Sequence, residues 1–259
     1  MLLNLAFLRE HHDLMLDPAR PGYEPKYSLE FTSKIPLKSH LYLRGSADKI
    51  IATEIPATND LGQPIIQKYA TFIDYKTYSK KFNRNALDYG FSLQLPIYAY
   101  MASKLPEFAD AKTLGLFIAP ILPSDLYGKG NKTLGEMRRN ALKISGVYLD
   151  DTAGLKTLDS GWTKSSIVEG LSFGKNGFRK DNARVLSADA MTEIISLTEQ
   201  KIYEAEARIR QGDFKLQPTS IKNFEGACEF CPFSDVCYKQ RSQTRVIRLK
   251  KETEGESDA

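Results

Sequence analysis

The stretch Thr71-Phe72-Ile73-Asp74-Tyr75-Lys76-Thr77 places two opposite charges inside an apolar run that has the composition of a buried strand. Side chains two residues apart on a strand share a face, so Asp74 and Lys76 project together while Tyr75 points the other way. Burying such a pair is costly unless each group has a partner, and a divalent cation on the carboxylate is one such partner. The stretch therefore predicts a central strand that carries a charged site.

A divalent cation needs further oxygen ligands, and Asp48 is the candidate for a second carboxylate. Two carboxylates with oxygens from backbone or water suit Mg²⁺ or Mn²⁺. Such an ion activates a bound water and neutralises phosphate charge, while Lys76 orients the nucleophile or stabilises developing charge. The set predicts phosphodiester hydrolysis. The alternative is a surface ion pair worth ~0 to 1 kcal/mol, which is the commoner meaning of an isolated Asp-x-Lys.

The residues upstream of Lys76 predict an antiparallel meander. Residues 30–51 are strand-like, with a hairpin expected near Gly45. Residues 50–55 and 65–74 then flank a turn-rich insert at 58–62. Asp48 and Asp74 would thus lie on strands of one meander, close enough to share an ion.

A helix is predicted next, with Asn85 as its N-cap and Pro96 expected to kink or divide it. Its stripe recurs at spacings of three and four, at Leu87, Phe91, Gln94, Tyr98, Met101 and Leu105. Gln94 and Tyr98 are one turn apart, so an amide and a phenol can point into one cleft. Core packing is the alternative for both, although a buried Gln94 would need a polar partner.

The rest of the chain predicts a mixed α/β fold. Residues 114–121 and 144–149 are expected to be strands, and 124–139 a loop. Ser187 should begin a long amphipathic helix that stops at Gly212. We expect a helix within residues 1–15, one domain over 1–240 and a mobile charged tail over 241–259.

Composition limits the function classes. The chain has 259 residues, 42% apolar and 26% charged, which excludes disorder as the main state. No stretch approaches a membrane span, so we expect no membrane association and a cytoplasmic location. The net charge of +4 does not by itself indicate nucleic acid, so any DNA contact must be local. There are two local basic groups, and each fits either phosphate contact or a solvated loop: Lys175, Arg179, Lys180 and Arg184, and Lys129, Lys132, Arg138 and Arg139.

The three cysteines form a Cys-x2-Cys-x5-Cys cluster at Cys228, Cys231 and Cys237. Close cysteines of this kind can surround one metal centre, either structural Zn²⁺ or an iron-sulfur cluster, and both usually take four ligands. The histidines, at 11, 12 and 40, are far away in sequence, so no fourth ligand is identified. Three reduced packing cysteines are the alternative.

Three motifs resemble those of RecB-type nucleases in the PD-(D/E)xK superfamily: Gly45-Ser46-Ala47-Asp48-Lys49, Ile73-Asp74-Tyr75-Lys76 and Gln94-Leu95-Pro96-Ile97-Tyr98. The resemblance implies a PD-(D/E)xK core, a central mixed sheet flanked by helices. It also implies a Mg²⁺ site at Asp48 and Asp74, with Lys76, Gln94 and Tyr98 completing the catalytic set. Residues 226–237 further resemble the C-terminal end of AddB-type (RexB-type) subunits.

The AddB-type resemblance implies a [4Fe-4S] cluster on Cys228, Cys231 and Cys237, with its first cysteine upstream of the motifs. Because no such cysteine is present, we expect the chain to be the C-terminal part of a longer subunit. The implied function is single-stranded DNA exonuclease activity within an AddAB-like helicase-nuclease that processes double-strand breaks for recombinational repair. Its partners would be DNA and an AddA-like helicase-nuclease subunit. This chain has no Walker A signature, so we do not expect it to hydrolyse ATP.

Two other functions stay open on the sequence. One is a stand-alone RecB-like exonuclease. The other is a non-catalytic DNA-binding scaffold domain, which the presence of Asp48, Asp74 and Lys76 disfavours.

Overall fold

The computed structural model describes residues 6, 9, 24–59, 61–77, 82–122, 133–159, 161–175, 177–178, 183–221, 228 and 231–249. The side chains of residues 24–31 and 241 are not included. Apart from Ala6 and Arg9, which are helical, the N-terminal helix predicted over residues 1–15 lies outside the described residues, as does the end of the predicted tail.

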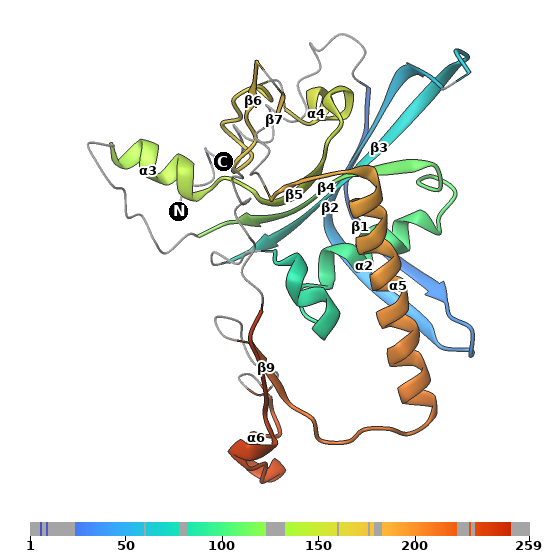
Figure 1. Cartoon of the computed structure of the whole chain (residues 1–259), viewed down its shortest axis with the longest axis vertical. Coiled ribbons are helices and arrows are strands. Elements are labelled where there is room, and N and C mark those ends of the chain that lie inside the picture. The colour runs from blue at the N-terminus through green and yellow to red at the C-terminus, as the bar shows by residue number, and fades with distance from the viewer. Residues whose placement is uncertain are drawn as a thin grey trace, which may run out of the picture.

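The centre of the molecule is a six-stranded mixed sheet in the order β1-β2-β3-β4-β5-β8 (Figure 1). Its strands are β1 (Glu24–Pro36), β2 (Tyr42–Thr58), β3 (Pro64–Lys76), β4 (Ala111–Pro120), β5 (Ser145–Leu149) and β8 (Val185–Leu186). β1, β2 and β3 form the predicted antiparallel meander, but its first hairpin turns at residues 37–41 and not near Gly45, which lies inside β2 and pairs with Ser33. β4 then runs parallel to β3, because a helical crossover connects the two. The predicted α/β fold, a central mixed sheet flanked by helices, is confirmed.

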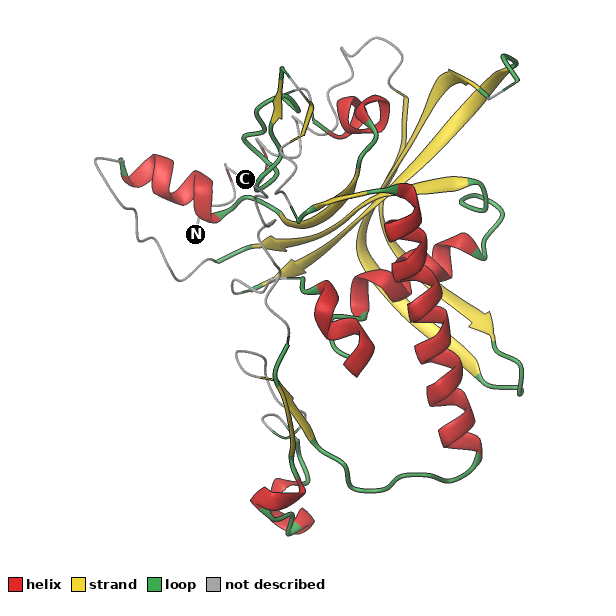
Figure 2. Cartoon of the chain, viewed as in Figure 1, coloured by secondary structure: helices red, strands yellow, loops and turns green. Residues whose placement is uncertain are grey.

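Helices cover both faces of the sheet (Figure 2). Their bounds are η1 (Arg84–Tyr89), α2 (Gln94–Ser103), α3 (Leu134–Ala141), α4 (Thr152–Leu158), α5 (Ala188–Arg210), α6 (Ser234–Cys237) and η2 (Arg241–Gln243). α2 contacts β2, β3 and β4, and α5 packs on α2. α4 lies on the other face, where Tyr69 of β3 donates a hydrogen bond to its N-cap, Asp151 (2.8 Å). Within the described part of the chain, none of the helices is long and apolar enough to cross a membrane.

The predicted single helix around Gln94 is divided, but not at the predicted place. Asn83, rather than Asn85, caps η1 by accepting a hydrogen bond from the amide of Asn85. η1 ends at Gly90, which has a φ of 82°, a left-handed conformation that glycine adopts at little cost. Pro96 lies in the first turn of α2, where a missing amide hydrogen costs no helical hydrogen bond, so it neither kinks nor breaks the helix.

Two further expectations need correction. Part of the predicted loop at 124–139 is helical, since α3 begins after Thr133, which forms a capping box with Glu136. Part of the predicted tail is also ordered, because β10 (Arg245–Ile247) pairs in parallel with β9 (Thr219–Ile221). The remaining small strands, β6 (Phe173–Gly174) and β7 (Gly177–Phe178), form a hairpin. The long helix α5 begins after its predicted cap, Ser187, whose side chain accepts from the amide of Ala190.

Candidate active site

Asp48 lies at a β-bulge of β2 relative to β1. Leu29 of β1 pairs with Ile50, but Phe31 pairs with Ala47, so two steps along β1 match three along β2. The extra residue falls at Asp48–Lys49. On the other side the β2–β3 register is regular, with Lys49 opposite Ile73, and its continuation places Asp48 opposite Asp74. Bulges are common next to functional sites, and the regular pairing of β2 with β3 puts both carboxylates on one face of the sheet.

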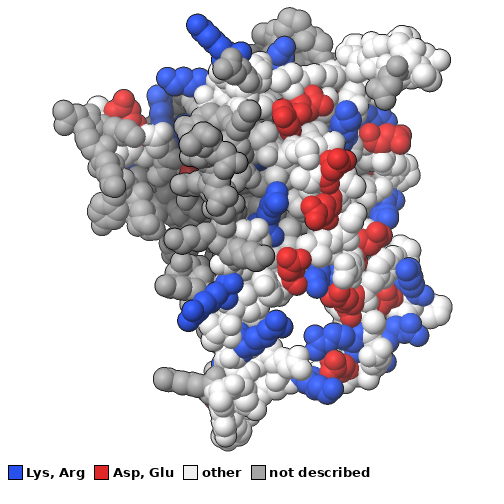
Figure 3. All heavy atoms as spheres, in the orientation of Figure 1, with Lys and Arg blue, Asp and Glu red and all other residues white. Residues whose placement is uncertain are grey.

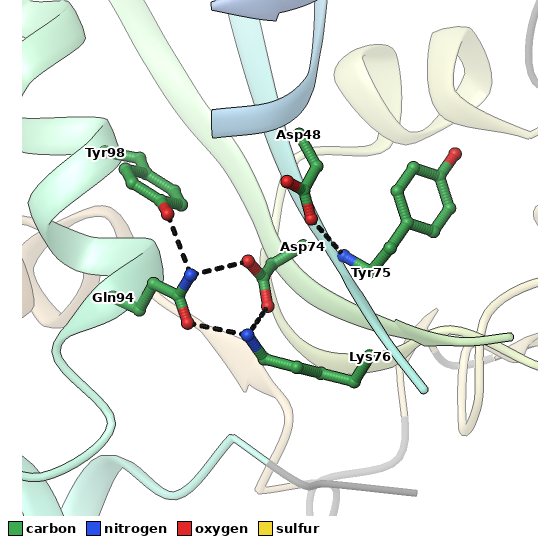
Figure 4. A network of polar contacts seen from close by, with 6 residues as sticks. All are labelled: Asp48, Asp74, Tyr75, Lys76, Gln94 and Tyr98. Carbon is green, nitrogen blue, oxygen red and sulfur yellow. Dashed lines mark hydrogen bonds and ion pairs between the residues drawn. The ribbon is translucent and has the colours of Figure 1, made fainter. Parts of the chain in front are cut away.

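Asp74 is buried, and both of its oxygens have partners (Figure 4). Lys76 Nζ lies 2.6 Å from Asp74 Oδ2, as the two-residue spacing predicts. Gln94 Nε2 donates to Asp74 Oδ1 at 2.8 Å. The buried carboxylate is thus held by an ammonium and an amide, the two kinds of partner that make its burial tolerable.

Gln94 joins α2 to the strand residues. Its Oε1 accepts from Lys76 Nζ (2.8 Å), and its Nε2 also donates to the Tyr98 hydroxyl (2.8 Å). The side chains of Gln94 and Tyr98 therefore point toward the strand pair, as their one-turn spacing predicts (Figure 4). The structure brings all five predicted residues, Asp48, Asp74, Lys76, Gln94 and Tyr98, to one site.

The backbone of β3 positions Asp48. The amide of Tyr75 donates to Asp48 Oδ2 at 2.7 Å, while the Tyr75 ring lies on the opposite side of the strand (Figure 4). Asp48 is exposed, in contrast to the buried Asp74. The backbone contact of Tyr75 escaped sequence reasoning because an amide donor leaves no mark in the residue types.

The surroundings of Asp74 favour its neutral form. Burial raises the pKa of this carboxyl group, the Lys76 ammonium lowers it, and the negative charge of Asp48 raises it again. The net direction is a pKa above the ordinary value of 3.8. Asp74 is therefore a group that an added cation would stabilise in its ionised form.

A pH-dependent stability follows for the protein without metal. A carboxyl group with a raised pKa keeps its proton in the native state after the unfolded chain has lost it. The free energy of unfolding should therefore fall as pH rises from about 3.8 through the raised pKa of Asp74. Thermal melting in EDTA between roughly pH 4 and pH 7 should show this fall in the wild type and lack it in Asp74→Asn. Parallel melting profiles for the two proteins would contradict the assignment.

Gly45 lets α2 approach the sheet beside Tyr98. A Cβ built on Gly45 would lie 3.0 Å from Met101 Sδ and 3.5 Å from Tyr98 Cε1. A glycine inside a strand pattern is the sequence signal for such a close approach, and it could have indicated this contact in advance.

The variant Gly45→Val should push α2 outward. Overpacking of this kind lowers the free energy of unfolding by about 1 to 3 kcal/mol, and any cleavage activity should fall with it because Tyr98 and Gln94 move together with the helix. Denaturant unfolding and a cleavage assay measure the two effects. Gly174→Val in β6, where an added Cβ would lie 3.8 Å from the carbonyl oxygen of Gly177, is the matched control and should change neither.

Cys228 and Cys231 precede α6, and Cys237 is the last residue of that helix. All three are free thiols of intermediate exposure, and the amide of Cys231 donates to the carbonyl of Cys228 at 3.5 Å. Among the residues that the structure describes, no three histidine, cysteine or acidic side chains come close enough together to hold a metal ion. A metal centre on these cysteines therefore stays a prediction. His11 and His12 lie outside the described residues, and His40 lies in the turn between β1 and β2.

The strands on either side of the cysteine segment are anchored on η1. Ile221 of β9 and Ile247 of β10 are buried against Ala86 of η1. The two strands that flank the cysteines therefore both pack on the short helix that precedes α2. Sequence reasoning missed this anchor because β9 and β10 are three residues each and far apart in sequence.

The mixed sheet, the Asp-x-Lys of β3 and the opposed carboxylate of β2 define a nuclease fold of the PD-(D/E)XK type. Residues 23–238 match the PD-(D/E)XK nuclease superfamily, and the chain belongs to that family. This confirms the resemblance drawn from the three motifs.

Three relatives share one name, that of the B-type subunit of an ATP-dependent helicase/deoxyribonuclease. The chain is 27% identical to that of Moorella thermoacetica over 203 residues, which are 76% of this chain and 17% of the relative. For Leuconostoc citreum the values are 28% over 225 residues, 83% of this chain and 18% of the relative. For Clostridium kluyveri the identity is 26% over 226 residues, which are 81% of this chain and 19% of the relative. The chain thus spans less than a fifth of the length of these relatives.

Proposed function

We propose that this chain is a metal-dependent deoxyribonuclease that degrades single-stranded DNA from an end. It would act as the nuclease module of an AddAB-like helicase-nuclease, with an AddA-like partner supplying the motor, in the processing of double-strand breaks. The observation that carries the proposal is the convergence of Asp48, Asp74 and Lys76 on one face of β2 and β3. Family membership and the printed name of the relatives support it.

The donor set fits Mg²⁺ or Mn²⁺. Asp48 and Asp74 offer hard carboxylate oxygens on adjacent strands, and such ions are bound by one or two carboxylates and keep several waters. The raised pKa of Asp74 indicates that protein groups alone do not fully compensate its anionic form. When bound, the ion supplies an activated water and neutralises charge on the scissile phosphate.

The side chains of this protein have distinct tasks in the proposed reaction. Gln94 holds Asp74 Oδ1 and so fixes the carboxylate plane, while the Tyr75 amide holds Asp48. Lys76 is partly exposed, with 27% of its side chain accessible. Its ammonium can therefore donate to phosphate oxygens as their charge grows in the transition state. Tyr98 bonds to the Gln94 amide and so positions it.

The [4Fe-4S] cluster is a separate proposal that rests on the Cys-x2-Cys-x5-Cys spacing. Cys228, Cys231 and Cys237 would supply three of four ligands. Iron analysis and visible absorption of anaerobically purified protein test it. An iron-free protein without a broad visible band would leave Zn²⁺ or three plain thiols.

The cleavage test uses linear single-stranded DNA labelled at one end, with a circular single strand of equal composition beside it. We expect degradation of the linear strand in Mg²⁺ or Mn²⁺, none in EDTA, and survival of the circle. Equal degradation with and without EDTA would contradict metal dependence. Cutting of the circle would contradict action from an end, and inertness of both strands in either metal would contradict the proposed activity of this chain.

A further inference from the structure

The end of α3 lies at the same edge of the sheet as the candidate active site. Lys76, the last residue of β3, pairs with Pro120 at the end of the parallel strand β4. β5 runs antiparallel to β4, with Ser145 opposite Ile118, so β5 begins at that edge. α3 ends at Ala141, just before β5, and extends outward from the edge (Figures 1 and 2). Two strand spacings of roughly 4.8 Å separate β5 from β3.

Packing in the hydrophobic core does not account for the formation of α3. None of its residues is buried, and the helix is capped by its own sequence. Thr133 Oγ1 accepts from the Glu136 amide (3.3 Å), while Glu136 Oε2 accepts from the Thr133 amide (2.7 Å). Leu142, which is fully buried, attaches the end of the helix to the body. The helix is thus capped and anchored, and its last turn leaves Arg139 exposed and Arg138 half-buried.

The end of α3 is locally basic. Arg138 and Arg139 lie in the last turn of α3, and Lys143 follows the helix. These three positive charges and the negative charge of Glu136 give residues 133–143 a net charge of +2. Glu136 is engaged in the capping box, so its charge lies at the far end of the helix. Elsewhere, on the face seen in Figure 3, basic and acidic side chains are interspersed. The start of β5, to which the last turn of α3 leads, lies two strand spacings, or roughly 10 Å, from β3, a length that about three stacked nucleotides span.

We propose that Arg138 and Arg139 bind the sugar-phosphate backbone of single-stranded DNA a few nucleotides from the site at Asp74 and Lys76. This proposal rests on the proposed nuclease function and names further substrate-positioning residues for it. Guanidinium groups suit this task because their fork of donors matches phosphate oxygens. The interaction is independent of base sequence, as an exonuclease requires.

The test measures binding of a labelled oligothymidine by anisotropy at several salt concentrations, in an Asp74→Ala background that cannot degrade the probe. Arg138→Gln/Arg139→Gln should raise Kd about tenfold and reduce the slope of log K against log salt by about 1.4, the value for two lost contacts to a single strand. The matched control is Arg208→Gln/Arg210→Gln, which removes two arginines from the last turn of α5. It should leave both quantities at the parent values.

Each outcome decides the proposal. An unchanged salt slope in the Arg138/Arg139 variant, or an equal loss in the α5 control, overturns it. Arg138→Lys/Arg139→Lys should retain most of the binding, so a loss there equal to that of the glutamine variant also overturns it, because the effect would then be structural. Cleavage by the wild-type chain tests the proposed function separately, and that activity can stand when the arginine contact fails.

Discussion

Asp74→Asn should reduce the rate of DNA cleavage by about 10⁴-fold, the scale seen when a single member of a catalytic set is removed. The asparagine keeps the shape of the side chain and can still accept a hydrogen bond from Gln94 Nε2 or Lys76 Nζ. It loses the negative charge that a divalent cation requires. Because the side chain is only 3% exposed and its charge is already disfavoured by burial, the fold should survive the change.

Single-turnover cleavage in Mg²⁺, with circular dichroism and thermal melting of the same samples, measures both effects. Asp110→Asn, an exposed aspartate between α2 and β4, is the matched control and should cleave like the wild type. If Asp74→Asn cleaved at the wild-type rate while remaining folded, the site would have to lie elsewhere in the molecule.

The parts of this site that the sequence predicted are those determined by local periodicity. The period of two along β3 predicts that Asp74 and Lys76 share a face, and they lie 2.6 Å apart. The helical period predicts that Gln94 and Tyr98 point the same way, and they share a hydrogen bond. In both cases a single element determines the geometry, so residue spacing is sufficient.

The parts that escaped prediction depend on pairing between elements. The bulge at Asp48 exists only relative to β1, since β2 and β3 pair regularly there. The pairing of β9 with β10 joins segments more than 20 residues apart through three residues on each side. Neither has a periodic signal of its own. The helix break at Gly90 does have a local signal, because a glycine that ends a helix in the left-handed region is a common stop, whereas Pro96 near a helix start is harmless.

Lys76→Met should lower cleavage by about 100- to 1000-fold while DNA binding stays close to that of the wild type. Methionine is similar in length, so the stem of the side chain still packs, but the ammonium between Asp74 Oδ2 and Gln94 Oε1 is lost. That cation lowers the pKa of Asp74 in the wild type, so its removal should raise this pKa further. The variant should therefore need a higher pH to reach its residual maximum rate.

The two effects of Lys76 separate it from a purely structural lysine. Lys112→Met, which removes a half-exposed ammonium 3.8 Å from Asp151, is the matched control and should move neither the rate nor its pH profile. Lys76→Arg should recover little activity, because a planar guanidinium does not fit the compact position between a carboxylate and an amide oxygen. Lys76→Met could lower the rate without shifting the acidic side of the pH–rate profile. That result would mean that Asp74 is not the group whose ionisation limits cleavage. The pH dependence of cleavage would then have to be assigned to Asp48.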